Sequence, residues 1–474
     1  MSGGAVGTGR AVDAALWRTA FVLVLGTFMA TLDSTIVSVG IDALAERFDA
    51  PVTDIQWVST AYLLAVVTAV PAAGWLADRF GGRRTWLVAV AVFLVGSVLC
   101  ALAWSLPSLI AFRVLQGLAG GLLPPIGQAL LARAAGRDRI GRVIAVVGVV
   151  PLLSPVLGPL AGGSILGVAD WPWLFYVNVP IGLVAILLAR RHVAAAAPGS
   201  RDVPFDLRGA LLLSPGLAVL VFGLTEVNGN APAVAAGAVV VGLGMLVAFV
   251  VHGLRTTRTP LVDPRLFTRP PFGVAALALA VLGASVFGAM FLLPLYFQTG
   301  RGLTAWEAGL LLAPQGVGAA VASVFVSRAI NAVAPRTLVL TGIALVAVGT
   351  APFTQLGHAL PDAVIVASLL VRGLGAAMIG APVMNIVYSR IEPSHLPRAS
   401  SALNLLNTVG GSIGTAILAV VLQDRLAANG SDVTAAFADT FWWVLGLALV
   451  AVLGATRLPR HRRPAAHEKG SADA

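Results

Sequence analysis

Long apolar runs alternate with short polar segments along the chain, and this pattern predicts membrane-spanning helices. A helix needs about 20 mostly apolar residues to cross the hydrocarbon core of a bilayer. Backbone that faces lipid must satisfy its own hydrogen bonds, so runs of this length can only be helical there. The sequence predicts fourteen spans, near residues 17–40, 55–77, 85–105, 107–132, 142–166, 172–190, 207–227, 232–254, 272–297, 304–327, 336–356, 361–386, 398–421 and 438–456.

The positions of the basic residues test this count, because cytoplasmic loops are enriched in Arg and Lys. If the amino terminus lies inside and the spans alternate, 26 of the 31 basic residues fall on the inside. Only Arg47, Arg301 and Arg425 fall outside, while Arg113 and Arg372 fall within spans. The pattern favours an even number of spans with both termini cytoplasmic. It also explains the net charge of +10 by topology rather than by nucleic-acid binding.

Composition narrows the function classes further. Only 11% of the residues are charged and 58% are hydrophobic, whereas soluble domains carry about 25% charged residues. The single cysteine, Cys100, excludes an internal disulfide, and the six histidines lack metal-ligand spacing. No phosphate-binding Gly-x-x-x-x-Gly-Lys-Ser/Thr sequence occurs. We therefore expect no metal, no cofactor and no enzyme activity, and the first apolar run is a span rather than a cleaved signal peptide.

Two pairs of similar segments indicate an internal repeat. Gln116–Pro125 and Arg372–Pro382 both begin with a polar residue and Gly and end at a proline deep in a span. Ala77–Val88 and Val326–Val339 are both short basic turns between spans. Such repeats are typical of transporters whose site lies between the halves. We expect an amino-terminal six-helix bundle (1–196), two linker spans (197–256), a carboxyl-terminal six-helix bundle (257–460) and a cytoplasmic tail (461–474).

Asp33 is the one acid that the pattern places inside a span, and Arg113 lies about two turns into the fourth span. An ionisable residue inside the membrane is by default a functional candidate. Arg113 has a second interpretation, in which its long side chain reaches back to the membrane surface. Two glycine-rich segments are further candidates. The first is a turn whose charged residues could form ion pairs that stabilise one conformation; it contains Gly74, Asp78, Arg79, Gly81, Arg83 and Arg84. The second is a hinge or a packing face in the fifth span; it contains Gly158, Pro159, Gly162 and Gly163.

Scattered polar side chains in or near the spans are candidates for a cavity lining. For Asn178 and the Asn404–Asn407 pair the alternative is an interhelical hydrogen bond, and for Glu226 and Glu307 it is a position at the membrane surface. The candidates for the lining are Ser34, Ser38, Gln116, Asn178, Glu226, Arg372, Asn404 and Asn407.

Several of these segments together resemble the major facilitator superfamily, and within it the fourteen-helix drug:H+ antiporters, over residues 15–456. The similar segments are LDSTIVSV, GWLADRFGGRR, RVLQG, GPLAGG, WPWLFYVNVPIG and LPLYFQTGRGLTAWEAGLLLAPQG. The resemblance implies alternating access and proton-driven export. It implies that Asp33 and Arg113 belong to the coupling machinery, and Asp78 and Arg83 to the gating loop. Ser38 and Asp42 depart from the family pattern, which usually has Asn and Pro there.

The expected function is proton-coupled export of a drug, antibiotic or secreted metabolite. The substrate would be a small lipophilic or amphipathic molecule, and the transporter a monomer in the bacterial cytoplasmic membrane. In the expected cycle Asp33 loads and releases a proton, and Arg113 stabilises its ionised form when the two approach. A proton-coupled importer of a small nutrient is the alternative, and the GPLAGG segment argues against it.

Overall fold

Helices make up nearly all of the chain that this computed structural model describes. The described residues are 6–195, 204–226, 231–256, 260–267, 272–330, 332–356, 360–389, 391, 395–430, 432–456 and 458. The tail expected at 461–474 and the domain boundary expected at 196–197 lie outside these residues.

The amino-terminal bundle, as we use the term, consists of α1 to α10. Their bounds are α1 (Val6–Ile36), α2 (Ile41–Phe48), α3 (Val52–Ala69), α4 (Ala72–Phe80), α5 (Gly82–Ala101), α6 (Leu106–Gly120), α7 (Leu123–Val147), α8 (Val150–Leu166), α9 (Trp173–Tyr176) and α10 (Asn178–His192). Proline marks one of the breaks. Pro71 lies between α3 and α4, which are bent by 57° relative to each other, since proline cannot continue the backbone hydrogen bonds of a helix.

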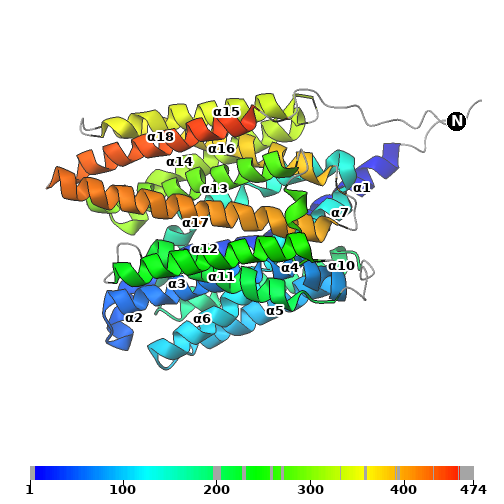
Figure 1. Cartoon of the computed structure of the whole chain (residues 1–474), viewed down its shortest axis with the longest axis horizontal. Coiled ribbons are helices and arrows are strands. Elements are labelled where there is room, and N and C mark those ends of the chain that lie inside the picture. Colours follow the sequence, from blue (N-terminus) through cyan, green and yellow to red (C-terminus); the bar gives the residue numbers. More distant parts are fainter. Residues whose placement is uncertain are drawn as a thin grey trace, which may run out of the picture.

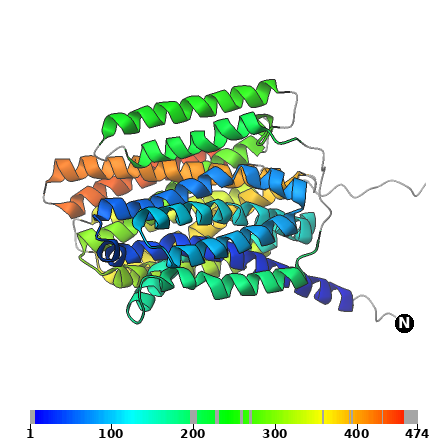
Figure 2. The same ribbon diagram turned by 90° about the horizontal axis from the view of Figure 1, so that it is seen from below.

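The carboxyl-terminal bundle consists of α13 to α18, and α11 and α12 connect the two bundles in sequence. Their bounds are α11 (Leu207–Thr225), α12 (Pro232–Arg255), α13 (Phe272–Leu295), α14 (Ala305–Ala329), α15 (Pro335–Thr350), α16 (Asp362–Tyr388), α17 (Leu396–Asn429) and α18 (Val433–Ala455). Figure 1 shows the two bundles as layers, with α13 to α18 above and α2 to α6 below. In Figure 2, α11 and α12 lie along one edge of the molecule.

The number of spans agrees only in part with the expected fourteen. Within the described residues, twelve helices are long and apolar enough to cross a membrane, or thirteen if the bent pair α3–α4 is one span. The difference lies in the expected span 142–166. There α7 ends at Val147, and α8 begins at Val150 as a separate helix of 17 residues. A complete fifth span therefore stays a prediction. The other helices form a multi-pass membrane protein.

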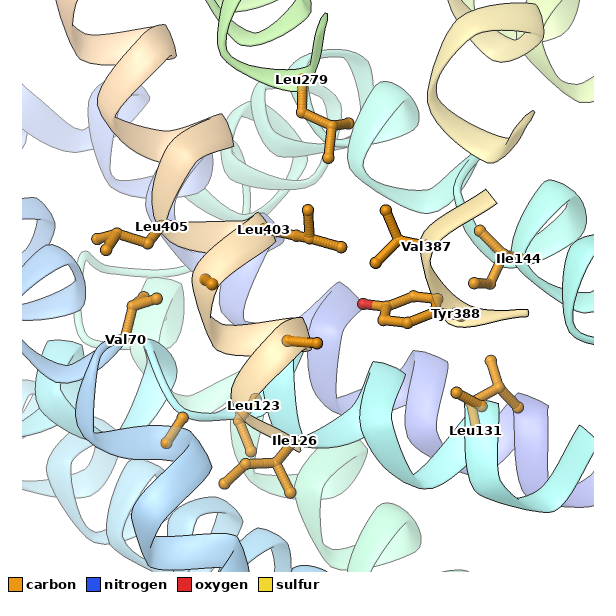
Figure 3. Packing of buried hydrophobic residues seen from close by; sticks show 14 of the residues in the cluster. Val70, Leu123, Ile126, Leu131, Ile144, Leu279, Val387, Tyr388, Leu403 and Leu405 are labelled. Atoms are coloured by element: carbon orange, nitrogen blue, oxygen red, sulfur yellow. The ribbon is translucent and has the colours of Figure 1, made fainter. Parts of the chain in front are cut away.

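The two bundles meet through side chains of α4, α7 and α8 on one side and α14, α16 and α17 on the other. Part of this contact is apolar and buried. Figure 3 shows Val70, Leu123 and Ile126 of the amino-terminal bundle near Leu403 and Val387 of the other, and all five belong to one buried cluster. Lipid is as apolar as these side chains, so close packing rather than burial from water stabilises the contact.

Candidate proton-coupling site and the contacts between the bundles

Asp33 lies near the end of α1, fully buried, at the centre of a polar cluster inside the amino-terminal bundle. Its Oδ2 accepts a hydrogen bond from Arg113 Nη1 of α6 at 2.5 Å. Its Oδ1 accepts from Gln116 Nε2, also of α6, at 2.9 Å, and from Asn178 Nδ2 of α10 at 2.7 Å. Three helices thus converge on one carboxylate. We call Asp33, Arg113, Gln116 and Asn178 the carboxylate cluster.

Arg113 is fully buried, so the interpretation in which it reaches the membrane surface is wrong. Its Nε donates to the backbone oxygen of Val58 at 3.1 Å. Its guanidinium carbon lies 4.1 Å from the centre of the Tyr62 ring, a distance at which the ring face attracts a cation. Its Nη2 has no hydrogen-bond partner among the described residues. The Asp33 carboxylate, the Val58 carbonyl and the face of the Tyr62 ring thus surround the buried cation.

Gln116 joins the two charges, because its side chain contacts both members of the ion pair. Its Oε1 accepts from Arg113 Nη1 at 2.5 Å, and its Nε2 donates to Asp33 and to Ser97 Oγ, the latter at 2.6 Å. Ser97 of α5 also accepts from Asn178 at 3.2 Å. Taking two charges out of water costs several kcal/mol for each ion. The surrounding donors and acceptors offset this cost only while Asp33 is ionised.

Asp33, Arg113, Gln116 and Asn178 were separate candidates in the sequence, which gave no sign that they contact one another. Gln116 and Asn178, expected as cavity lining, are fully buried in the cluster. The sequence missed Ser97 and Tyr62, which complete the surroundings. Ser97 follows Gly96 within an apolar run, and this pair of small residues is the signal in the sequence that could have pointed to Ser97. Ser34 does not join the cluster, because its hydroxyl donates to the backbone oxygen of Thr31 in its own helix. The side chain of Ser38 lies outside the described part of the chain.

Helix α4, which leads into the glycine-rich turn, carries an ion pair between the two bundles. Asp78 Oδ2 accepts from Arg398 Nε of α17 at 2.9 Å, and both side chains are largely buried. Gly74 makes the approach possible, since a Cβ there would lie 3.0 Å from the Cα of Arg398. Arg83 donates to the backbone oxygen of Arg190. Gly81 has a φ of 86°, which allows the sharp turn between α4 and α5, and Arg79 and Arg84 are exposed there.

A second polar contact between the bundles lies close to this ion pair in sequence. Tyr388 Oη of α16 donates to Gln128 Oε1 of α7 at 3.1 Å, and Asn404 Nδ2 of α17 donates to the same oxygen at 2.8 Å. Ser400 Oγ donates to the backbone oxygen of Pro125 at 2.8 Å. We call this set the glutamine bridge. It places Asn404 at a bundle interface, as the packing alternative predicted.

The glycines and proline of the fifth-span segment pack in two directions. On one side, a Cβ at Gly158 would collide with Thr35 of α1, and one at Gly162 would lie 3.1 Å from the backbone oxygen of Ile36. On the other side, Pro159 and Gly163 of the same helix face α14: a Cβ on Gly309 would lie 3.3 Å from Pro159, and one on Gly163 would lie 3.7 Å from the Trp306 ring. The segment α8 thus connects the helix of Asp33 to the other bundle.

The remaining polar candidates lie apart from the carboxylate cluster. Glu226 ends α11 and is half-buried. Glu307 caps the first turn of α14, where its carboxylate accepts from the backbone N–H of Thr304 at 2.8 Å. Asn407 packs its backbone against Gly283 of α13. Arg372 is buried within the carboxyl-terminal bundle, and its surroundings are described below.

Comparison with known proteins identifies the class. The family described as Major Facilitator Superfamily matches residues 23–415. A relative named multidrug resistance protein B homolog, from Mycobacterium tuberculosis, is 38% identical over 90% of this chain and 79% of its own length. The multidrug export protein EmrB of Haemophilus influenzae is 32% identical over 89% of this chain and 83% of its own.

Solved structures agree at the level of the fold. The proton:xylose symporter XylE superposes with a TM-score of 0.66 at 16% identity, covering 93% of this chain and 95% of that one. The chain belongs to the major facilitator superfamily, and its relatives are multidrug resistance proteins. It is therefore a membrane transporter and not an enzyme, and the resemblance found in the sequence is confirmed.

Proposed function

We propose that this chain exports a drug, antibiotic or secreted metabolite across the bacterial cytoplasmic membrane in exchange for protons. The observation that carries the proposal is the buried ion pair between Asp33 and Arg113, whose Nη1 lies 2.5 Å from the carboxylate. The names of the relatives, which refer to multidrug resistance and export, support the direction and the substrate class. The substrate is then a small lipophilic or amphipathic molecule.

Proton coupling follows from what protonation would do to the carboxylate cluster. An ionised Asp33 accepts three hydrogen bonds and neutralises Arg113. A proton on Asp33 removes the charge attraction and turns one of the two carboxylate oxygens into a donor that faces other donors. The interactions that hold α1, α6 and α10 together at Asp33 are then weakened, so the protonated protein favours a different arrangement. Proton binding and conformation are thereby linked.

Alternating access needs contacts between the bundles that open in turn. The ion pair Asp78–Arg398 and the glutamine bridge form one set, and the contact of α8 with α14 forms the other. The charge pattern of the sequence places the first set at the cytoplasmic side, with both termini there. In this proposal fourteen spans form two six-helix bundles and a linker pair, and the transporter acts as a monomer.

The test uses Asp33→Asn, which keeps the shape of the side chain but carries no exchangeable charge. The variant is reconstituted into vesicles with a fluorescent dye substrate, and a pH gradient drives uptake in the inside-out orientation. We expect no proton-driven transport, and no alkalinisation of the vesicle interior when substrate is added. Thr31→Val, on the same helix, is the matched control. Full transport by Asp33→Asn would contradict the mechanism.

The alternative function, proton-coupled import, predicts the opposite direction of net movement. Intact cells that express the protein are loaded with a labelled compound, and its loss or accumulation is followed with and without a proton uncoupler. Export predicts that the uncoupler increases the cellular content. An uncoupler that lowers the content would favour import.

A further inference from the structure

Arg372 lies in the carboxyl-terminal bundle at the position that Gln116 holds in the amino-terminal bundle. Gly117 follows Gln116 and packs on α3, where an added Cβ would collide with a backbone oxygen. Gly373 follows Arg372 and packs on α14, where an added Cβ would again collide with a backbone oxygen. The same close approach therefore occurs at the same place in both repeats, which fixes the correspondence.

A second pair of glycines supports this alignment. Gly96 of α5 packs against the backbone and Cβ of Gln116, and Gly349 of α15 packs against the backbone and Cβ of Arg372. The two positions differ in what their side chains meet. Gln116 donates to the carboxylate of Asp33, whereas none of the ion pairs among the described residues joins Arg372 to an acid.

Arg372 is almost completely buried, with 3% of its surface exposed. Its N–H groups make few hydrogen bonds with the described residues. Its Nη2 lies 3.4 Å from the backbone oxygen of Ser285 on α13, and its Nε has no partner in the described part of the chain. Ser285 Oγ is also buried without a partner there. A buried charge that lacks a counter-charge costs several kcal/mol, which binding of an anion would offset.

A cavity lined in part by Ser285, though not by Arg372 itself, gives such an anion a place. Ser285 lines it together with aliphatic side chains of α13, α15, α16 and α18, among them Leu282, Val346 and Ile379. It has room for about one or two water-sized groups. A halide ion or a single carboxylate group fits this space, while a whole drug-sized molecule does not. Ser285 is the polar residue of this lining, and Arg372 contacts the same residue through its backbone oxygen.

We propose that Arg372 and Ser285 form a receptor for one monoanionic group. The guanidinium Nε–H and the serine hydroxyl donate to it, which makes charge-assisted hydrogen bonds stronger than neutral ones. The group is either a free small anion or the carboxylate of an organic compound, and the second source rests on the proposed export function. The amino-terminal bundle thus carries its own anion, Asp33, and the carboxyl-terminal bundle takes one from outside.

The test measures anion binding to the purified full chain without any proton gradient, so it is independent of the proposed export. Thermal unfolding in detergent at constant ionic strength compares sodium chloride with sodium sulfate, whose anion is divalent and carries no carboxylate, and 2-naphthoate with the neutral 2-naphthamide. We expect an anion to raise the Tm of the wild type. Arg372→Gln should raise the half-maximal concentration about tenfold or more, the usual effect of losing a charged hydrogen-bond partner. Arg328→Gln, which removes an exposed charge of α14, is the control.

The two sources give different results. A rise with chloride identifies a free small anion, and a rise with naphthoate but with neither chloride nor naphthamide identifies a carboxylate on an organic compound. If Arg372→Gln does not fold, Arg372→Lys and Ser285→Ala provide the comparison, and both should bind more weakly than the wild type. An absent anion-dependent shift, or equal shifts in wild type and the Arg372 variants, would overturn the proposal.

Discussion

Breaking the ion pair between Asp78 and Arg398 should open the interface between the bundles at that end of the molecule. The two side chains are 12% and 18% exposed, so the pair lies between a surface ion pair and a fully buried one. Surface pairs contribute up to about 1 kcal/mol, and removing one partner of a buried pair costs about 3–5 kcal/mol. We therefore expect Arg398→Gln to destabilise the closed arrangement by about 2 kcal/mol. That shifts the ratio of open to closed forms about 30-fold.

The assay measures a distance between the bundles at this end. Spin labels at Ala194→Cys and Ala332→Cys, in a Cys100→Ala background, report it by pulsed electron paramagnetic resonance. Both label sites are exposed, and one lies in each bundle. Arg398→Gln should move the population to longer distances, and Asp78→Asn should do the same. Arg191→Gln removes an exposed charge at the end of α10 and should leave the distribution unchanged.

A double variant separates the pair from its surroundings. If the ion pair is what closes this end, Asp78→Asn combined with Arg398→Gln should open it no further than the worse single variant. Additive effects, or a distribution that neither single variant changes, would refute the reasoning. In that case the glutamine bridge and the apolar layer would be sufficient to hold the bundles together.

Three further predictions concern single positions. Gln116→Leu removes the side chain that joins both charges and leaves Ser97 with fewer partners, so proton-driven transport should fall about tenfold or more while expression is retained, measured in the vesicle assay. Gly158→Val forces α8 away from α1 because a Cβ there collides with Thr35, and we expect transport to be lost; Gly237→Val, at a position of α12 with open space, should be tolerated. Tyr388→Phe removes one donor of the glutamine bridge, which should lengthen the label distance less than Arg398→Gln does, since the lost hydrogen bond is between neutral groups.

The fold was largely predictable because lipid imposes simple rules on the chain. The length of the apolar runs predicted most of the helices. The span at 142–166 was harder to predict, since a break between Val147 and Val150 divides it into two helices that hydropathy alone joins. Breaks of this kind depend on backbone geometry that a run of apolar letters does not reveal.

Some residues of the candidate site stood out in the sequence, but their arrangement did not. Asp33 and Arg113 were conspicuous because charge inside a span is costly. Arg398, the partner of Asp78, was not, because it lies 320 positions along the chain in a segment with ordinary basic composition. Which helix faces which is set by close packing at glycines such as Gly74, and the sequence shows the glycine without its neighbour.

The contacts also suggest a route by which protonation of Asp33 would alter the packing between the two bundles. Two residues beyond Asp33, Thr35 Oγ1 donates to the backbone oxygen of Ser154 on α8 at 3.1 Å. One turn further along α8, Pro159 faces α14 of the carboxyl-terminal bundle. A shift of α1 on protonation must therefore move α8 or break this hydrogen bond, and α8 cannot move without changing its contact with α14. Protein interiors are packed too densely to absorb such a shift continuously, so the response is a change between two packed arrangements.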